Sequence, residues 1–160
     1  MKKYTQEEFD NMPVVDGRKQ CPSGDYSEIK SFGERCSFGE CCSFGECCSF
    51  GECCSFGEWC SFGEWCSFGD ECKCEFGGFY HVISCGGFGS EYRTTYFFGL
   101  TDGKICVRCG CFHGTIEEWA EKVKKTHGDS LLAKAYLGLI EPVKIMMQYV
   151  REGGRREWKD

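Results

Sequence analysis

Residues 31–72 consist of seven hexapeptides that follow one another without interruption: SFGERC, SFGECC, SFGECC, SFGECC, SFGEWC, SFGEWC and SFGDEC. Each contains Ser, Phe, Gly, an acidic residue, a variable residue and Cys, in that order. A strict repeat of this kind indicates one short structural unit stacked on copies of itself. A period of six does not match the 3.6-residue period of an α-helix, so we expect a short strand and a corner in each hexapeptide.

The repeat resembles the hexapeptide-repeat family, whose members form left-handed parallel β-helices. The resemblance runs from Phe32 and Cys36 to Phe68 and Cys72, and it implies a mainly β fold with a short left-handed parallel β-helix, regular over residues 31–76. This chain has Phe where the family usually has aliphatic residues. The small Cys side chain at the other inward position is expected to compensate for three large rings in each coil.

A second family is similar in part. Pentapeptide-repeat proteins form a right-handed, square β-helix, and the run Cys36-Ser37-Phe38-Gly39-Glu40 follows their pattern. The sixth residue of each unit does not fit that pattern. We therefore favour the left-handed coil, and the right-handed coil stays open as the alternative.

Three hexapeptides per coil would place residues that are 18 apart above one another, at a spacing of about 4.8 Å. The Phe and Cys positions would then form internal columns. On one side of the coil these columns would contain Phe32, Phe50 and Phe68, and Cys36, Cys54 and Cys72. We expect the Gly after each Phe to supply a positive φ at the corner, and the next, acidic residue to point to solvent.

The segments on either side of the repeat predict one cap and one further unit. Residues 1–30 are expected to cap the solenoid, with a capping box at Thr5–Glu8 that begins a short helix and a strand and turn at 14–17. Apolar residues at a spacing of six extend the predicted solenoid irregularly, over residues 31–90. Residues 91–160 predict an α+β unit.

This C-terminal unit is expected to contain a β-hairpin and two helices. The hairpin would join a strand that begins at Tyr92 to a strand over residues 104–112. The first helix would begin after a capping box at Thr115–Glu118. The second would begin near residue 130, kink at Pro142 and end near Val150. The Cys-Ser-Phe-Gly-Glu array is followed by a tail that contains Val107-Arg108-Cys109-Gly110-Cys111-Phe112. This layout resembles that of proteins of gut Firmicutes and their phages that carry no established activity.

The net charge of −6 is concentrated in the repeat, since residues 31–76 hold nine acidic and two basic side chains, a net charge of −7. This balance disfavours direct contact with nucleic acid, because binding to phosphates requires basic side chains. It favours a partner protein with a basic surface. The expected contact residues are the repeat acids and two outward-facing tryptophans. They are Glu34, Glu40, Glu46, Glu52, Glu58, Glu64 and Asp70, with Trp59 and Trp65 as anchors.

The cysteines are interpreted first as repeat positions. Residues 1–8 lack an apolar stretch after their lysines, which argues against a secretory signal and predicts the reducing cytosol of a host cell. No run of the sequence approaches the roughly 20 apolar residues of a membrane helix. We therefore expect reduced thiols, no metal and no cofactor. The fallback metal ligands, on spacing alone, are Cys106, Cys109, Cys111 and His113.

Enzymatic function receives little support. Many left-handed β-helices are acyltransferases that use a His general base, but His81, His113 and His127 all lie outside the repeat. No Gly-rich elbow marks a Cys–His pair for nucleophilic catalysis. We expect a non-enzymatic, self-associating binding protein, encoded by a phage or another mobile element. Its acidic solenoid would imitate DNA and inhibit a nucleic-acid-handling or defence enzyme. The alternatives are an acyltransferase-like enzyme and a purely structural module.

Overall fold

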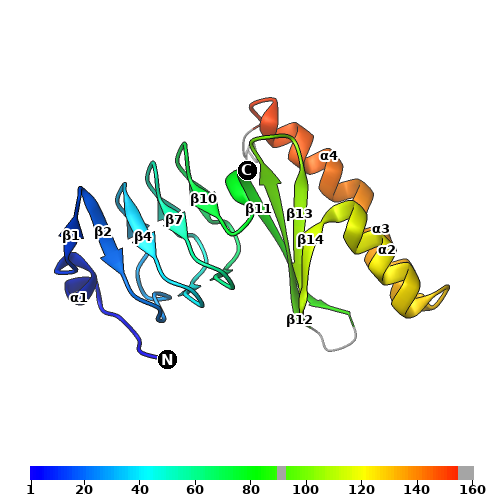
Figure 1. Cartoon of the computed structure of the whole chain (residues 1–160), viewed down its shortest axis with the longest axis horizontal. Coiled ribbons are helices and arrows are strands. Elements are labelled where there is room, and N and C mark those ends of the chain that lie inside the picture. Colours follow the sequence, from blue (N-terminus) through cyan, green and yellow to red (C-terminus); the bar gives the residue numbers. More distant parts are fainter. Residues whose placement is uncertain (90–92, 155–160) are drawn as a thin grey trace, which may run out of the picture. The chain divides into compact units, whose positions relative to one another are not determined.

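The computed structural model describes residues 1–89 and 93–154 of the chain. These residues form two compact units (Figure 1). The solenoid unit contains Met1–Tyr80 and Leu100–Asp102. The sheet–helix unit contains His81–Gly99 and the described residues from Gly103 onward. The boundary expected at residues 90 and 91 lies outside the described residues.

The hexapeptides form a parallel β-solenoid of about three turns, as predicted. Its strands are β3 (Ser31–Phe32), β4 (Cys36–Phe38), β5 (Ser43–Phe44), β6 (Ser49–Phe50), β7 (Ser55–Phe56), β8 (Ser61–Phe62), β9 (Ser67–Phe68) and β10 (Lys73–Cys74). They pair in three parallel series, β3-β6-β9, β4-β7-β10 and β5-β8. The register confirms the 18-residue coil, since Ser31 pairs with Ser49 and Ser43 pairs with Ser61.

Phenylalanine rings fill the interior of the coil. Within a column the rings lie parallel: the centroids of Phe32 and Phe50 are 4.7 Å apart, with an interplanar angle of 10°. Between columns the rings meet edge to face, as Phe38 and Phe44 do at 4.8 Å and 86°. Each such pair stabilises the fold by about 0.5–1.5 kcal/mol beyond its area burial. The rings therefore lock both the stacking of the coils and the arrangement of the three faces.

The prediction of a positive φ at the repeat glycines is wrong. The left-handed conformation belongs to the variable fifth residue, where φ lies between 56° and 66° from Arg35 to Glu71. The glycines instead allow the backbones of successive coils to approach one another closely. A Cβ on Gly63 would lie 2.5 Å from the backbone nitrogen of Glu46 in the preceding coil, a separation that real Cβ atoms do not reach.

The N-terminal segment closes one end of the ring columns. The predicted capping box is confirmed, with Thr5 as N-cap of α1 (Gln6–Asp10), and β1 (Val14–Val15) and β2 (Arg18–Cys21) form the predicted strand and turn. Tyr26, fully buried, lies 18 residues before Phe44 and stacks on its ring at 5.7 Å and 20°. Tyr26 therefore occupies the position that a Phe would have in a coil before the first hexapeptide.

At the other end of the columns, residues 77–80 of β11 (Gly77–Phe88) belong to the solenoid unit and cover the last coil. This strand turns back antiparallel to β10, with Cys74 opposite Gly77, so parallel stacking ends at β10. Phe79 is buried beneath the last coil and meets Phe68 edge to face at 4.8 Å. β10 and β11 therefore form an antiparallel hairpin at the point where a further coil would otherwise begin.

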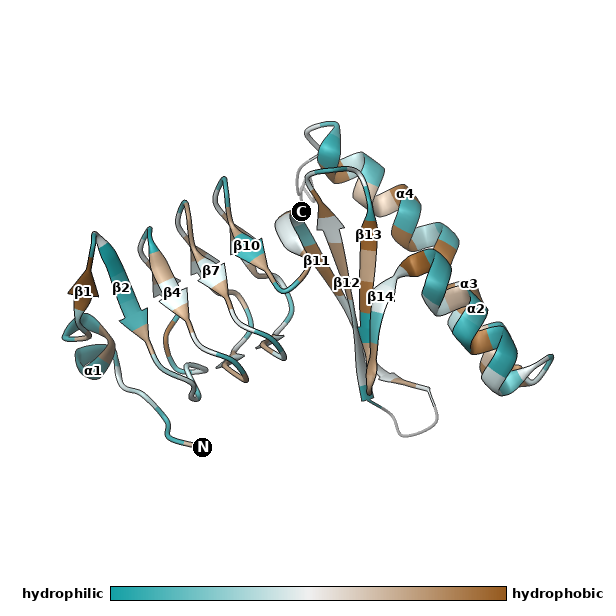
Figure 2. Cartoon of the chain, viewed as in Figure 1, coloured by the Kyte–Doolittle hydropathy of each residue, from teal (hydrophilic) through white to brown (hydrophobic). Residues whose placement is uncertain are grey.

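The sheet–helix unit contains the antiparallel strands β12 (Arg93–Leu100), β13 (Ile105–Cys109) and β14 (Phe112–Thr115) beside β11. Helices α2 (Ile116–His127), α3 (Leu131–Gly138) and α4 (Ile140–Arg151) lie on one side of these strands (Figure 1). Figure 2 shows apolar residues concentrated on β12 and β13 and mixed hydropathy along the helices. Phe97 of β12 is fully buried and meets Trp119 of α2 edge to face.

Two details of this unit differ from the prediction. The strand expected over 104–112 ends at Cys109, because Gly110, with φ 58°, and Cys111 form a tight turn into β14. The last helix is broken at Leu139 and not at Pro142. Pro142 lies in the first turn of α4, where a missing N–H costs no helical hydrogen bond.

We predict that Gly63→Ala destabilises the solenoid by about 1–3 kcal/mol, because the added methyl would force two coils apart. Gly33→Ala is the matched control, since a Cβ at the same repeat position of the first coil would meet nothing within 4 Å. Urea unfolding midpoints of the two variants give the comparison. Equal losses would contradict the close-approach role of Gly63.

Candidate functional site

The seven acidic residues of the repeat are all exposed, as expected. The 18-residue register arranges them in three series, one at each corner of the coil, which we call the acidic corners. The first corner carries Glu34, Glu52 and Asp70, the second Glu40 and Glu58, and the third Glu46 and Glu64. Successive carboxylates in a series are therefore about one strand spacing apart, roughly 4.8 Å at the backbone.

Backbone hydrogen bonds fix the positions of these acids. The amide N–H of Cys41 donates to the carbonyl oxygen of Glu58 at 2.8 Å, and that of Cys47 donates to Glu64 at 2.8 Å. Within residues 1–89 and 93–154, none of the seven carboxylates forms an ion pair. Solvent and salt screen the repulsion between stacked carboxylates, over a Debye length of about 8 Å at physiological ionic strength.

The residue after each acid points outward from a left-handed backbone conformation. Trp59 and Trp65 occupy this position, with 42% and 57% of their surfaces exposed. They follow Glu58 and Glu64 directly, one coil beyond Cys41 and Cys47. Each tryptophan therefore belongs to an acidic corner, and the two corners border the face formed by β5 and β8.

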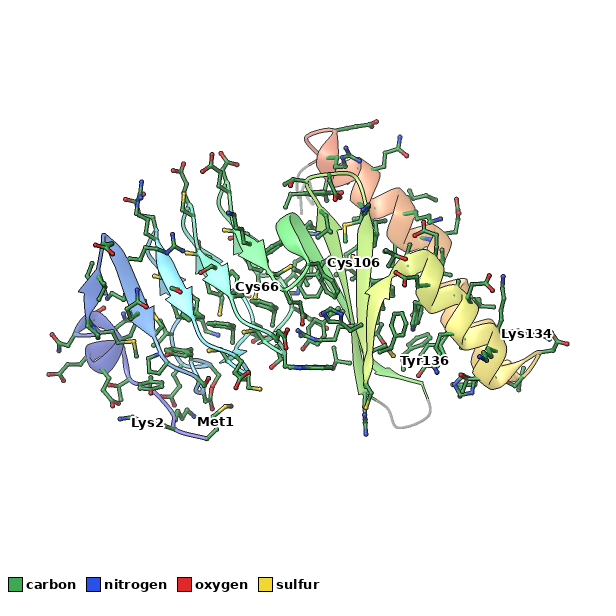
Figure 3. All side chains as sticks on the ribbon, in the orientation of Figure 1. Met1, Lys2, Cys66, Cys106, Lys134 and Tyr136 are labelled. Carbon is green, nitrogen blue, oxygen red and sulfur yellow. The ribbon has the colours of Figure 1, made fainter. Side chains whose placement is uncertain are left out.

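The sixth residue of each unit points inward and supplies a thiol to the corner. The carbonyl oxygen of Gly39 accepts a hydrogen bond from the Cys42 thiol at 3.2 Å and another from the Cys60 thiol of the next coil at 3.4 Å. Cys66, labelled in Figure 3, likewise donates to the carbonyl oxygen of Gly45 at 3.4 Å. A thiol at this position fills space and also satisfies a carbonyl that no backbone amide reaches.

The inward thiols of the folded chain differ in pKa. Contact with neighbouring thiols of the stack raises the pKa of Cys36, Cys48 and Cys72, with burial as a further cause. The same kind of contact lowers the pKa of Cys42, Cys54 and Cys66. None of the sixteen cysteines, which all lie among the described residues, forms a disulfide. Cys41, Cys47 and Cys111 are exposed at corners or turns. These outward thiols are accessible to electrophiles, whereas burial limits access to the stacked inward thiols.

The fallback metal ligands are not brought together. His113 pairs with Arg108 across the β13–β14 hairpin, which places it on the same sheet face as Cys106, whereas Cys109 points to the opposite face and Cys111 lies in the turn. No group of three or more Cys, His, Asp or Glu side chains among the described residues could hold a metal ion.

No protein family, curated protein or solved structure matches the chain. Within the described part of the chain, no helix has the length and apolar character needed to cross a membrane.

We predict that iodoacetamide at pH 8 alkylates Cys41, Cys47 and Cys111 in a fast phase. Cys36, Cys48 and Cys72 should react far more slowly, because a raised pKa leaves little thiolate at that pH and burial blocks access. Intact mass followed over time, with a sample in urea as control, measures the phases. A single rate for all sixteen thiols of the folded protein would contradict the inward placement.

Proposed function

We propose that the solenoid unit is a non-enzymatic protein-binding module whose acidic corners engage a basic surface of another protein. The observation that carries this proposal is the arrangement of seven exposed carboxylates in three rigid series without intramolecular ion pairs among the described residues. A fixed array of like charges weakens the folded state, and a partner of opposite charge relieves that repulsion.

The spacing of the carboxylates supports imitation of nucleic acid. Each strand of B-DNA presents one negative charge per 3.4 Å of helix axis, and each acidic corner presents one per roughly 4.8 Å. A groove that binds a phosphate backbone through Lys and Arg would meet a similar linear charge density here. The partner is accordingly a nucleic-acid-handling or defence enzyme, and the module inhibits it by occupying its basic groove.

The left-handed conformation of the fifth residue of each hexapeptide supports a role for its side chain in binding. A residue other than Gly costs about 1–2 kcal/mol in this conformation, yet the repeat places Arg, Cys, Trp or Glu there in every unit. Trp59 and Trp65 would add apolar anchors beside Glu58 and Glu64, because Trp is enriched among residues that dominate binding energies.

The origin and family of the module belong to the same proposal. The Phe-Gly and Cys spacing supports membership of the hexapeptide-repeat family and a left-handed coil. The layout supports a phage or another mobile element as its source, with action in the cytosol of the host cell.

Charge reversal tests the proposal. The variant Glu40→Lys, Glu52→Lys and Glu58→Lys should lose capture of its partner from host lysate, because three exposed acids on two corners change sign. Capture by the unaltered protein should weaken as salt increases. Circular dichroism checks that the variant keeps its fold.

The matched control changes three exposed acids of the sheet–helix unit, Glu121→Lys, Asp129→Lys and Glu141→Lys, and so reaches the same net charge. It should retain the partner. If both variants capture the partner equally well, the acidic corners are not the binding surface.

We also propose that the chain self-associates through α4. Ile145 and Met146 of this helix are 56% and 45% exposed, and Tyr149, one turn further on, is 46% exposed. Apolar side chains that gather on one side of a helix are typical of a protein interface.

Light scattering at micromolar concentration should give a mass above the 18.2 kDa of one chain. Ile145→Glu with Met146→Glu should return the mass to that of a monomer, because two charges would be buried at the interface. Lys144→Glu, a neighbouring exposed position, is the control. A monomeric mass for the unaltered chain would exclude the proposal.

A further inference from the structure

The sixth residue of each hexapeptide lies above the sixth residue of the preceding coil, so the inward thiols form columns inside the solenoid. The strand register defines the longest of them, since Ser37 of β4 pairs with Ser55 of β7, and Ser55 pairs with Lys73 of β10. The residues that precede these three are all buried, with 1% or less of their surfaces exposed. This thiol column consists of Cys36, Cys54 and Cys72.

Neighbouring sulfurs of the thiol column touch one another. The Cys54 thiol is in hydrogen-bond contact with Cys36 on one side and with Cys72 on the other. Backbone carbonyls hold the three side chains in place. The oxygen of Gly33 accepts from Cys36 at 3.5 Å and from Cys54 at 3.4 Å, and that of Gly51 accepts from Cys72 at 3.5 Å. The sulfurs therefore lie in a row along the axis of the coil.

The spacing of this row suits a metal ion that takes two ligands in line. Paired strands are about 4.8 Å apart. A metal–thiolate bond is about 2.3 Å long for zinc, so an ion of similar size midway between two sulfurs requires them about 4.6 Å apart. Thiolate sulfur selects soft ions such as Cu(I). Zn²⁺ takes four ligands in a tetrahedron, and the described residues provide no group of even three.

The charge of a loaded column can be offset. When Cu(I) binds between two cysteines, two S–H bonds break, two Cu–S bonds form and two protons pass to solvent, which leaves one negative charge. A second ion that shares the middle sulfur releases one more proton and adds no charge. Arg18 lies beside the column, because its Nη2 donates to the carbonyl oxygen of Cys53 at 2.7 Å and to the hydroxyl of Ser55 at 3.2 Å. Its guanidinium therefore brings a positive charge to both sides of Cys54.

We propose that the thiol column binds Cu(I), with one ion between Cys36 and Cys54 and a second between Cys54 and Cys72. Each ion has two sulfur ligands, and the Cys54 sulfur is shared by both. The ions enter through local opening of the coils. The site lies inside the solenoid, so it is independent of the acidic corners and would remain if the proposed binding of a basic partner were wrong.

Titration with Cu(I) in the absence of oxygen, in competition with the chelator bicinchoninate, tests the proposal. Outward thiols also attract copper, so they are first replaced by Ser to give a background chain. This chain should remove Cu(I) from the chelator while it remains folded. Failure to do so would overturn the proposal. The replaced residues are Cys41, Cys47, Cys53 and Cys111.

Single substitutions in the background chain locate the ions. Cys54→Ser should lose two bound ions, because its sulfur is shared, and Cys72→Ser should lose one, since a hydroxyl can still donate to the glycine carbonyl but is a poor ligand for Cu(I). Cys106→Ser, which changes a buried thiol outside the solenoid unit, is the matched control and should lose none. Equal losses in Cys54→Ser and Cys72→Ser would contradict the shared sulfur and overturn the site.

A measurement on the background chain itself does not depend on the folding of these variants. X-ray absorption at the copper edge should show two sulfur neighbours for each ion. The urea midpoint of the loaded chain should be higher than that of the copper-free chain, because the column exists only in the folded state. Three or more sulfur neighbours, or loss of the folded circular dichroism signal on loading, would overturn the proposal.

Discussion

Contact between stacked phenylalanine rings is the interaction on which the solenoid depends. A coil of three hexapeptides has little room inside, and three rings fit only when they meet edge to face across the coil. Parallel stacking, as between Phe38 and Phe56 at 5.3 Å and 8°, then fixes the rise from one coil to the next. The other positions of the hexapeptide accommodate this spacing: Gly permits the close approach of backbones, and the Cys thiol satisfies the Gly carbonyl that this approach leaves without an amide.

The packed Phe rings also allow the solenoid to carry its negative surface charge. Two or three carboxylates stacked at each corner oppose folding, and none of them forms an ion pair with another described residue. A core with specific ring contacts in every coil tolerates that repulsion. The proposed function therefore depends on the core, because only a rigid coil holds the carboxylates in fixed series.

Much of the solenoid could be predicted because a strict repeat transmits one local conformation along the chain. The coil size, the inward Phe and Cys and the outward acids followed from the period together with the resemblance to hexapeptide-repeat proteins. The conformation of the corner did not, because Gly is favoured both by a positive φ and by close backbone approach, and sequence does not distinguish the two causes. The role of Tyr26 was detectable, since it lies 18 residues before Phe44.

The rest of the chain has no period and was predicted less well. The capping boxes at Thr5 and Thr115 were found, because their signal is local. The division of the second predicted strand was missed, because the alternation of apolar residues continues through Gly110 and conceals the turn. The grouping of Arg93, Lys122 and Tyr136 around one pocket was also missed, because the three residues come from separate elements and no spacing in the sequence connects them.

The three-fold coil has a consequence for chains of this kind that differ in length. Adding or deleting three hexapeptides would lengthen or shorten the stack and leave every later side chain at its own corner. Adding one hexapeptide would instead turn all later residues by a third of a revolution. Trp59 and Trp65 would then move to different edges, although the composition and the core would hardly change. Which side chains share an edge therefore depends on whether the number of added or deleted hexapeptides is a multiple of three.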